Sequence, residues 1–187
     1  RKYKMKHYLD ITLLADDEIP IYFVRNKVYS KLHKALFELQ TTDIGVSFPK
    51  YKVMLGDVLR LHGTEFKLTE LQNTNWLGGL SGYCQVSGIQ IIPDKVMHRT
   101  VSRIQANMTE AKLRRLIKRG TISTEEAKHY KAKMFSQGLD NPYLELESTS
   151  NGHKHRRYLV FSDKITESIT GKFDFFGLSK VATVPWF

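Results

Sequence analysis

The chain has 187 residues, of which 41% are hydrophobic and 21 are aromatic (10 Phe, 9 Tyr, 2 Trp), and this composition excludes a wholly disordered protein. The formal net charge of +10 favours a nucleic acid, a membrane surface or an acidic partner. No apolar run reaches the roughly 18 residues of a membrane helix, and no signal-peptide pattern opens the chain. We therefore expect a soluble, cytoplasmic protein that does not bind a membrane. Cys84 is the sole cysteine, which excludes a disulfide framework and a Cys-rich metal site.

Six elements are predicted in the first half. Alternating and helical apolar patterns predict strands and helices over these segments: a strand at His7–Leu13, a helix after Pro20, strands at Ile44–Phe48 and Val58–His62, a helix at Lys67–Asn73 and a strand at Tyr83–Ile92. The order β-α-β-β-α-β is typical of a ferredoxin-like, RNA-recognition-like fold. We therefore predict an α+β protein whose first domain covers residues 1–95.

His33 lies on the predicted helix that follows Pro20. It falls about 120° from the centre of the apolar arc, in line with Tyr29 and Phe37. A core histidine would lie nearer the leucines, so we expect His33 on a flank of the helix that can be reached from outside. From position alone, such a residue is more often a surface histidine without a role.

The second half, residues 96–187, is predicted to be an α+β domain built around an arginine-rich helix. Between Arg99 and Lys133 there are ten Lys or Arg and three Glu, a net charge of +7. On a helix over Glu110–Arg119, three apolar residues span about 100° and the cations about 160° of the surface. The apolar residues are Leu113, Leu116 and Ile117, and the cations are Lys112, Arg114, Arg115, Lys118 and Arg119. We favour a polyanion-binding helix docked by its apolar seam; a solvated basic face is the alternative.

Other signals set the limits of this domain's elements. Thr109 suits the N-cap of the basic helix and Gly120 its end. Ser123 and Glu126 have the spacing of a capping box, which predicts a second helix. We also expect an extended segment over residues 99–106, and two strands, Tyr143–Glu147 and Arg156–Phe161, around a polar turn at Ser148–Gly152.

Eight short motifs distributed along nearly the whole chain resemble those of one enzyme family, the type I-F CRISPR repeat-processing endoribonucleases. In order, they are His7–Asp10, Lys31–His33, Ile44–Pro49, Val101–Gln105, Leu113–Leu116, Ser148–Ser150, Gly177–Lys180 and Val184–Phe187. Each motif is weak alone, but the eight in sequence, with the basic helix in the right place, are specific.

The resemblance implies a metal-independent RNase that binds the hairpin of a CRISPR repeat and cuts at the 3′ base of its stem. The upstream 2′-hydroxyl would attack the phosphate, leaving a 2′,3′-cyclic phosphate and a 5′-hydroxyl. The implied partners are the repeat hairpin, the mature guide RNA and the subunits of a type I-F surveillance complex, without a metal or a small-molecule cofactor. The alternatives are a non-cleaving RNA-hairpin-binding subunit and a generic basic nucleic-acid module.

The resemblance also assigns roles to individual residues. His33 matches the catalytic histidine, and a 2′-hydroxyl needs a base with a pKa near neutrality, for which histidine is the usual choice. Ser148 matches the serine that holds the attacking hydroxyl. Arg103 and Gln105 match residues that read base edges, as Arg reads guanine and Gln adenine. The remaining RNA contacts implied are Lys112, Arg114, Arg115, Lys118, Arg119, Ser150, Asn151 and Phe176.

Three positions depart from the family pattern. Phe176 stands where the best-known members carry a tyrosine, so any orienting role of that hydroxyl is absent. Gly120 and Asn151 stand where we expect other polar residues. These differences affect the expected rate and the repeat sequence rather than the class of enzyme.

Overall fold

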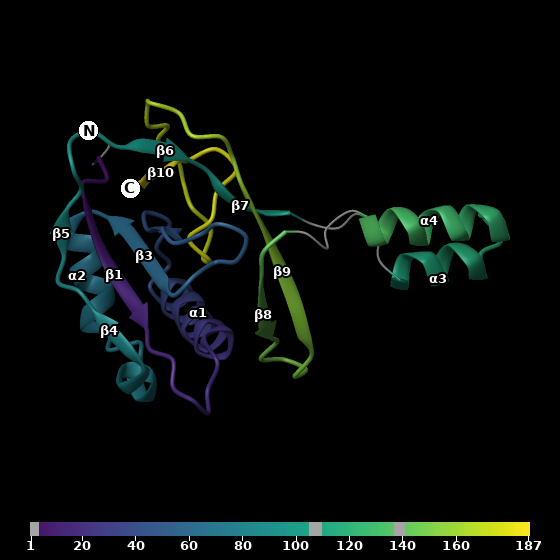
Figure 1. Ribbon diagram of the computed structural model, residues 1–187, viewed down its shortest axis with the longest axis horizontal. Coiled ribbons are helices and arrows are strands. Elements are labelled where there is room, and N and C mark those ends of the chain that lie inside the picture. The colour runs from purple at the N-terminus through teal and green to yellow at the C-terminus, as the bar shows by residue number, and fades with distance from the viewer. Residues whose placement is uncertain (1–3, 105–109, 137–140) are drawn as a thin grey trace.

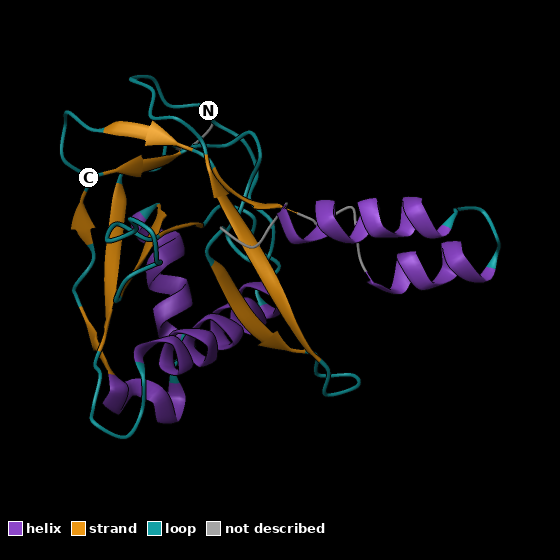
Figure 2. Ribbon diagram, turned by 45° about the vertical axis from the view of Figure 1, so that its right-hand side comes forward, coloured by secondary structure: helices purple, strands orange, loops and turns teal. Residues whose placement is uncertain are grey.

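The computed structural model describes residues 4–104, 110–136 and 141–187 of the chain (Figure 1). The first elements occur in the predicted order and close to the predicted bounds. They are β1 (His7–Leu13), α1 (Ile21–Glu38), β2 (Gly45–Ser47), β3 (Val58–Gly63) and α2 (Glu65–Asn73). The prediction of an α+β protein is confirmed at this level: helices are combined with antiparallel sheets (Figure 2).

The single strand predicted over Tyr83–Ile92 is wrong. This segment instead ends a 3₁₀ helix, η1 (Gly78–Tyr83), and continues as two short strands, β4 (Cys84–Val86) and β5 (Gln90–Ile91). The register against β1 shifts by one residue between the two strands, since Ile11 pairs with Val86 but Tyr8 with Gln90. At this point the Ser87 hydroxyl accepts a hydrogen bond from the backbone N–H of Asp10 at 2.8 Å. Both short strands still pair with β1.

The first sheet has the strand order β2-β3-β1-β4, with β5 also beside β1, and all of its pairs are antiparallel. Leu9 faces Leu61 and Ile11 faces Leu59, and all four side chains are fully buried. The apolar residues of α1 recur every four positions and are buried against this sheet, as Leu32 and Leu36 show. Burial of each such side chain stabilises the fold by about 1.5–3 kcal/mol, so α1 is firmly fixed.

The second half forms two small sheets and a helix pair. Its elements are β6 (Met97–Arg99), β7 (Val101–Ile104), α3 (Glu110–Lys118), α4 (Thr124–Ser136), β8 (Tyr143–Glu147), β9 (Lys154–Phe161) and β10 (Val184–Trp186). The sheets have the orders β7-β9-β8 and β10-β6. The two helices and the two strands after residue 110 are confirmed. Within the described ranges, no helix is long and apolar enough to cross a membrane.

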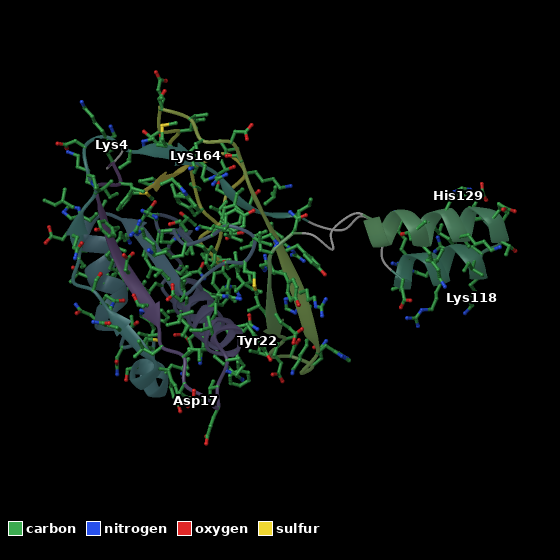
Figure 3. The ribbon with its side chains drawn as sticks, in the orientation of Figure 1. Lys4, Asp17, Tyr22, Lys118, His129 and Lys164 are labelled. Atoms are coloured by element: carbon green, nitrogen blue, oxygen red, sulfur yellow. The ribbon has the colours of Figure 1, made fainter. Side chains whose placement is uncertain are left out.

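α3 and α4 lie side by side and extend away from the sheets, and Figure 3 labels Lys118 and His129 on this pair. The predicted capping box is confirmed, since Ser123 N donates to Glu126 Oε2 at 2.6 Å and Glu126 N donates to Ser123 Oγ at 3.2 Å. Gly120 ends α3 with a φ of +65°. The predicted apolar seam is narrower than expected: Leu113 is buried within the pair, whereas Ile117 is exposed.

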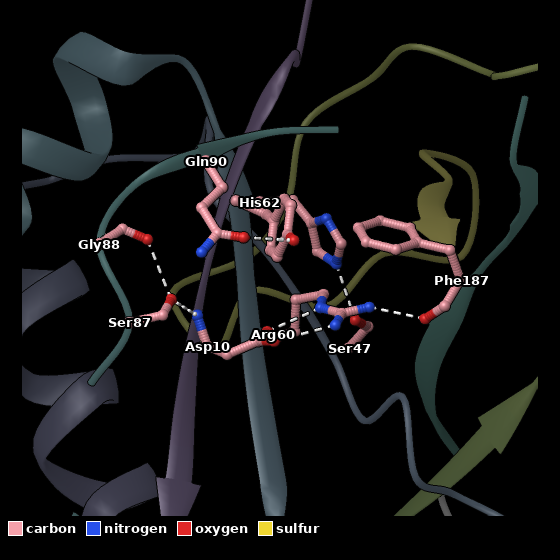
Figure 4. A network of polar contacts seen from close by, with 9 residues as sticks. Asp10, Ser47, Arg60, His62, Ser87, Gly88, Gln90 and Phe187 are labelled. Atoms are coloured by element: carbon pink, nitrogen blue, oxygen red, sulfur yellow. Dashed lines mark hydrogen bonds and ion pairs between the residues drawn. The ribbon is translucent and has the colours of Figure 1, made fainter. Parts of the chain in front are cut away.

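One cluster of buried residues joins both halves of the chain. Leu36 of α1 belongs to it together with Leu146 of β8, Leu159 of β9 and Val184 of β10. A polar network beside this cluster holds the last residues (Figure 4). There Arg60 donates to both carboxylate oxygens of Asp10, at 2.7 and 2.9 Å, and to the backbone oxygen of Phe187 at 2.6 Å. The last residues are therefore fixed to the first sheet. The boundary at residue 95 stays a prediction.

Candidate active site and nucleic-acid interface

His33 is held on α1 by the segment that follows β9. Its side chain is half-buried, on the flank of the helix, and Nδ1 lies 2.8 Å from the backbone carbonyl oxygen of Phe175. A carbonyl oxygen can only accept, so Nδ1 carries the proton and donates. In the neutral ring Nε2 then has a free lone pair and can act as a base. The backbone of Phe175 therefore fixes the tautomer that general-base chemistry requires.

The ring of Phe176 supports the imidazole from one side. The two rings are stacked, with centroids 3.6 Å apart and planes inclined by 6°. The guanidinium carbon of Arg157 lies 3.5 Å from the centre of the same phenyl ring. Two groups this close to one ring centre must occupy opposite faces, so Phe176 is sandwiched between His33 and Arg157. Tyr29 completes the packing, because its hydroxyl donates to the backbone oxygen of Phe176 at 2.7 Å.

A tight turn places this pair of phenylalanines. Asp174 Oδ1 accepts from the backbone N–H groups of Phe176 at 2.8 Å and Leu178 at 3.0 Å. Gly177 follows with a φ of +70°, a left-handed conformation that favours glycine. Its carbonyl oxygen accepts from the N–H of Val46 at 2.9 Å, which joins the turn to β2. The family motif that begins at Gly177 is thus a turn that positions the histidine's partners.

Ser148 lies in the turn between β8 and β9, where the sequence predicted it. Its hydroxyl forms a hydrogen bond with that of Ser150 at 2.9 Å, and Asn151 Oδ1 accepts from the N–H of His153 at 3.1 Å. Ser148 is half-buried, and Ser150 and Asn151 are exposed. No hydrogen bond joins Ser148 to His33, both of which lie in the described part of the chain. α1 and β8 contact each other elsewhere, where the backbone N–H of Glu145 donates to Asn26 Oδ1 at 3.1 Å.

Arg103 lies on β7 opposite Leu159 of β9, and its side chain is half-buried. Residues on one strand alternate between faces and opposed residues share a face, so Arg103, Arg157 and Leu159 lie on the same face of the sheet. Gln105, the second predicted base-reading residue, and Thr109, the predicted N-cap, lie outside the described residues.

The five cations of the basic segment are all exposed. Arg114 forms an ion pair with Glu110 at 3.6 Å, and Arg115 Nε donates to the carbonyl oxygen of Ala111 at 3.3 Å. Arg119 directly follows the last residue of α3. The segment therefore presents several positive charges to solvent on one short helix, an arrangement that attracts a polyanion. The remaining two of these five exposed cations are Lys112 and Lys118.

Arg157 is a residue that the sequence reading missed. Only 7% of its surface is exposed, and it lies on β9 at the same face as the buried Leu159. Burial lowers the pKa of Arg157, and the neighbouring Arg103 lowers it further. An arginine in phase with the apolar residues of a strand is unusual. The spacing of two residues between Arg157 and Leu159 could have predicted its burial from the sequence. The other basic residues of β9 made this spacing hard to recognise.

Comparison with known proteins identifies the family. A model of the family described as CRISPR-associated protein (Cas_Csy4) matches residues 8–187, nearly the whole chain. The chain belongs to the Cas_Csy4 family. This membership confirms the resemblance that the eight motifs predicted.

Two curated relatives of this Cas_Csy4 chain carry the name CRISPR-associated endonuclease Cas6/Csy4. The one from Escherichia coli (strain UTI89 / UPEC) is 37% identical over 184 residues, and the one from Pseudomonas aeruginosa (strain UCBPP-PA14) is 36% identical over 187 residues. Each match covers 98% of this chain and 100% of the relative. A solved structure described as CRISPR endoribonuclease Cse3 bound to 19 nt RNA is 13% identical, with a TM-score of 0.42, over 96% of this chain and 100% of that one.

Proposed function

We propose that this chain is an endoribonuclease that binds the hairpin of a CRISPR repeat and cleaves it at the 3′ base of the stem. Full-length identity of 36–37% to relatives named as CRISPR-associated endonucleases supports the activity. The observation that carries the mechanism is the 2.8 Å contact between His33 Nδ1 and the carbonyl oxygen of Phe175. It leaves the lone pair of Nε2 free on a half-buried histidine at the flank of α1.

In the proposed reaction, His33 Nε2 removes the proton of the ribose 2′-hydroxyl upstream of the cut. The 2′ oxygen attacks phosphorus, the bond from phosphorus to the 5′ oxygen breaks, and that oxygen takes up a proton from water. The products are a 2′,3′-cyclic phosphate and a 5′-hydroxyl, and no metal is needed. Ser148 would hold the attacking hydroxyl in line. The carbonyl of Phe175 stabilises the imidazolium that forms, and the stacked Phe176 ring keeps its plane fixed.

Binding is proposed to use the second half of the chain. The exposed cations of α3 and Arg119 would contact phosphates, while Arg103 and Gln105 would read base edges low in the stem. Ser150 and Asn151 would contact RNA from the turn beside Ser148. A ferredoxin-like domain at residues 1–95 would carry the base, and the domain at 96–187 would hold the stem. The enzyme would retain the mature guide RNA as a subunit of a type I-F surveillance complex.

The alternative is a non-cleaving subunit that only holds the hairpin. Two observations favour it: Phe176 has no hydroxyl, and Ser148 and His33 are not hydrogen-bonded to each other in the described residues. The two functions share the binding surface and differ in chemistry, so cleavage separates them.

The test incubates the protein with the host's CRISPR repeat RNA in EDTA and identifies the ends of the products. We expect one cut at the stem base and a cyclic phosphate. A single 2′-deoxy nucleotide upstream of the cut should abolish cleavage and leave binding nearly unchanged. His33→Ala should slow cleavage by about 10²- to 10⁴-fold, and Lys34→Ala, its exposed neighbour on α1, should not. A metal requirement, or cleavage of the deoxy substrate, would rule out internal attack; binding without cleavage would establish the alternative.

A further inference from the structure

The face of the β7-β9-β8 sheet that meets Phe176 carries three basic side chains close together. Arg103 lies opposite Leu159, and Arg157 and His155 precede Leu159 by two and four positions on β9. Alternation along a strand places all three on one face, with Arg103 and Arg157 as diagonal neighbours. On the same face of β8, the residues opposite Arg157 and His155 are Leu144 and Leu146. The strands therefore supply no acid to this face of the sheet.

The side chain of Arg157 forms no hydrogen bond or ion pair with another described residue. Only 7% of the surface of Arg157 is exposed. Its Nε and the Nε of Arg103 are both buried without a hydrogen bond. The contact with Phe176 compensates the charge only in part, because an aromatic ring has no acceptor for the N–H groups of the guanidinium. A buried cation is costly unless a counterion accompanies it.

The electrostatics of the three groups agree with this geometry. Burial lowers the pKa of His155, and Arg157 and Arg103 lower it further. The pKa of Arg157 is also lowered, first by burial and then by Arg103. Tyr29 and then Asp174 act in the opposite direction and raise the pKa of Arg157. However, Asp174 Oδ1 already accepts two backbone hydrogen bonds, and among the described residues its carboxylate forms no ion pair with the guanidinium of Arg157. The positive charge of the cluster is thus only partly compensated.

We propose that Arg157, with Arg103 beside it, forms a binding site for one phosphate group of the RNA, next to the cleavage site. This inference rests on the proposed function, which supplies the RNA. The planar guanidinium suits a phosphate because it can donate two parallel hydrogen bonds. The site is adjacent to the base, since Arg157 and His33 contact opposite faces of one ring, Phe176. It is separate from the exposed cations of α3.

The experiment measures binding of a non-cleavable hairpin, with one 2′-deoxy nucleotide upstream of the cut, over a series of salt concentrations. Arg157→Leu should weaken binding about ten- to a hundred-fold and reduce the slope of log affinity against log salt by about 0.7–0.9. Arg157→Lys, which keeps the charge, should retain the slope and part of the affinity. Arg156→Leu is the matched control, because Arg156 lies on the opposite face of β9 and pairs with Glu145 at 3.6 Å.

A second series locates the ligand. Hairpins with a single uncharged methylphosphonate at successive positions near the stem base are bound to the wild type and to Arg157→Leu. One position should weaken the wild type and have no further effect on the variant. If every position weakens both proteins equally, or the salt slope of Arg157→Leu is unchanged, Arg157 only supports Phe176 and the inference is wrong. Failure of the wild type to bind the hairpin would instead refute the proposed function.

Discussion

Gly177 offers a direct test of whether the turn after β9 positions His33, the proposed general base. Its φ is +70°, and a Cβ added there would overlap Cγ2 of Val46 and lie 3.1 Å from Cβ and 3.2 Å from N of Val46. The left-handed conformation costs an alanine about 1–2 kcal/mol, and overpacking of a core costs about 1–3 kcal/mol. We therefore expect Gly177→Ala to lower the free energy of unfolding by about 2–5 kcal/mol, measured by urea denaturation.

The same substitution should affect cleavage more than binding. To relieve the overlap the turn must move, and with it the carbonyl of Phe175 and the ring of Phe176 that orient His33. A shift of about 1 Å in such a group can cost about a hundred-fold in rate. Single-turnover cleavage at a temperature at which the variant is folded should fall by that order. Its affinity for the non-cleavable hairpin should change little.

Gly120→Ala is the matched control. Gly120 also has a positive φ, +65°, but no described atom would lie within 4 Å of an added Cβ. Gly120→Ala should lower the free energy of unfolding only by the cost of the left-handed conformation, about 1–2 kcal/mol. If Gly177→Ala is no less stable than Gly120→Ala, or cleaves at the wild-type rate, the turn does not hold the base in the way described.

Three further predictions concern other parts of the chain. Arg119→Ala should reduce the salt slope of hairpin binding by about 0.7–0.9, measured by fluorescence anisotropy, and an unchanged slope would show that no phosphate lies there. Burial, followed by Arg60, lowers the pKa of His62 to about 3. Below pH 6.5 only the unfolded state then takes up the proton, so stability should fall by about 2 kcal/mol from pH 7 to 5, and His62→Gln should remove this loss in urea titrations. Ser123→Ala should destabilise α4 by about 0.5–2 kcal/mol, seen as faster hydrogen exchange at Glu126.

The elements with a strong apolar period could be predicted from the sequence. β1 begins and ends at the predicted residues, and α1 has the predicted apolar stripe. His33 was placed on the flank of α1 from helical geometry alone, and the structure has it there, half-buried. In each case the signal is local, because neighbouring side chains on one element determine which face is buried.

Features that depend on distant residues could not be predicted. The Ser87 hydroxyl, which lies between β4 and β5, accepts a hydrogen bond from the backbone of Asp10, 77 residues earlier. The orientation of His33 comes from a carbonyl 142 residues later in the chain. Arg157 looks like one more cation in a basic strand until the register with β7 shows which way it faces. Periodicity contains none of these pairings, so the site's details needed the tertiary structure.

The hydrogen bond from His33 Nδ1 to the Phe175 oxygen has an evolutionary consequence. Enzymes that orient a histidine with a carboxylate lose that orientation by a single substitution, whereas a main-chain acceptor is supplied by any residue type. The side chain at position 175 can therefore change without loss of the acceptor that orients His33.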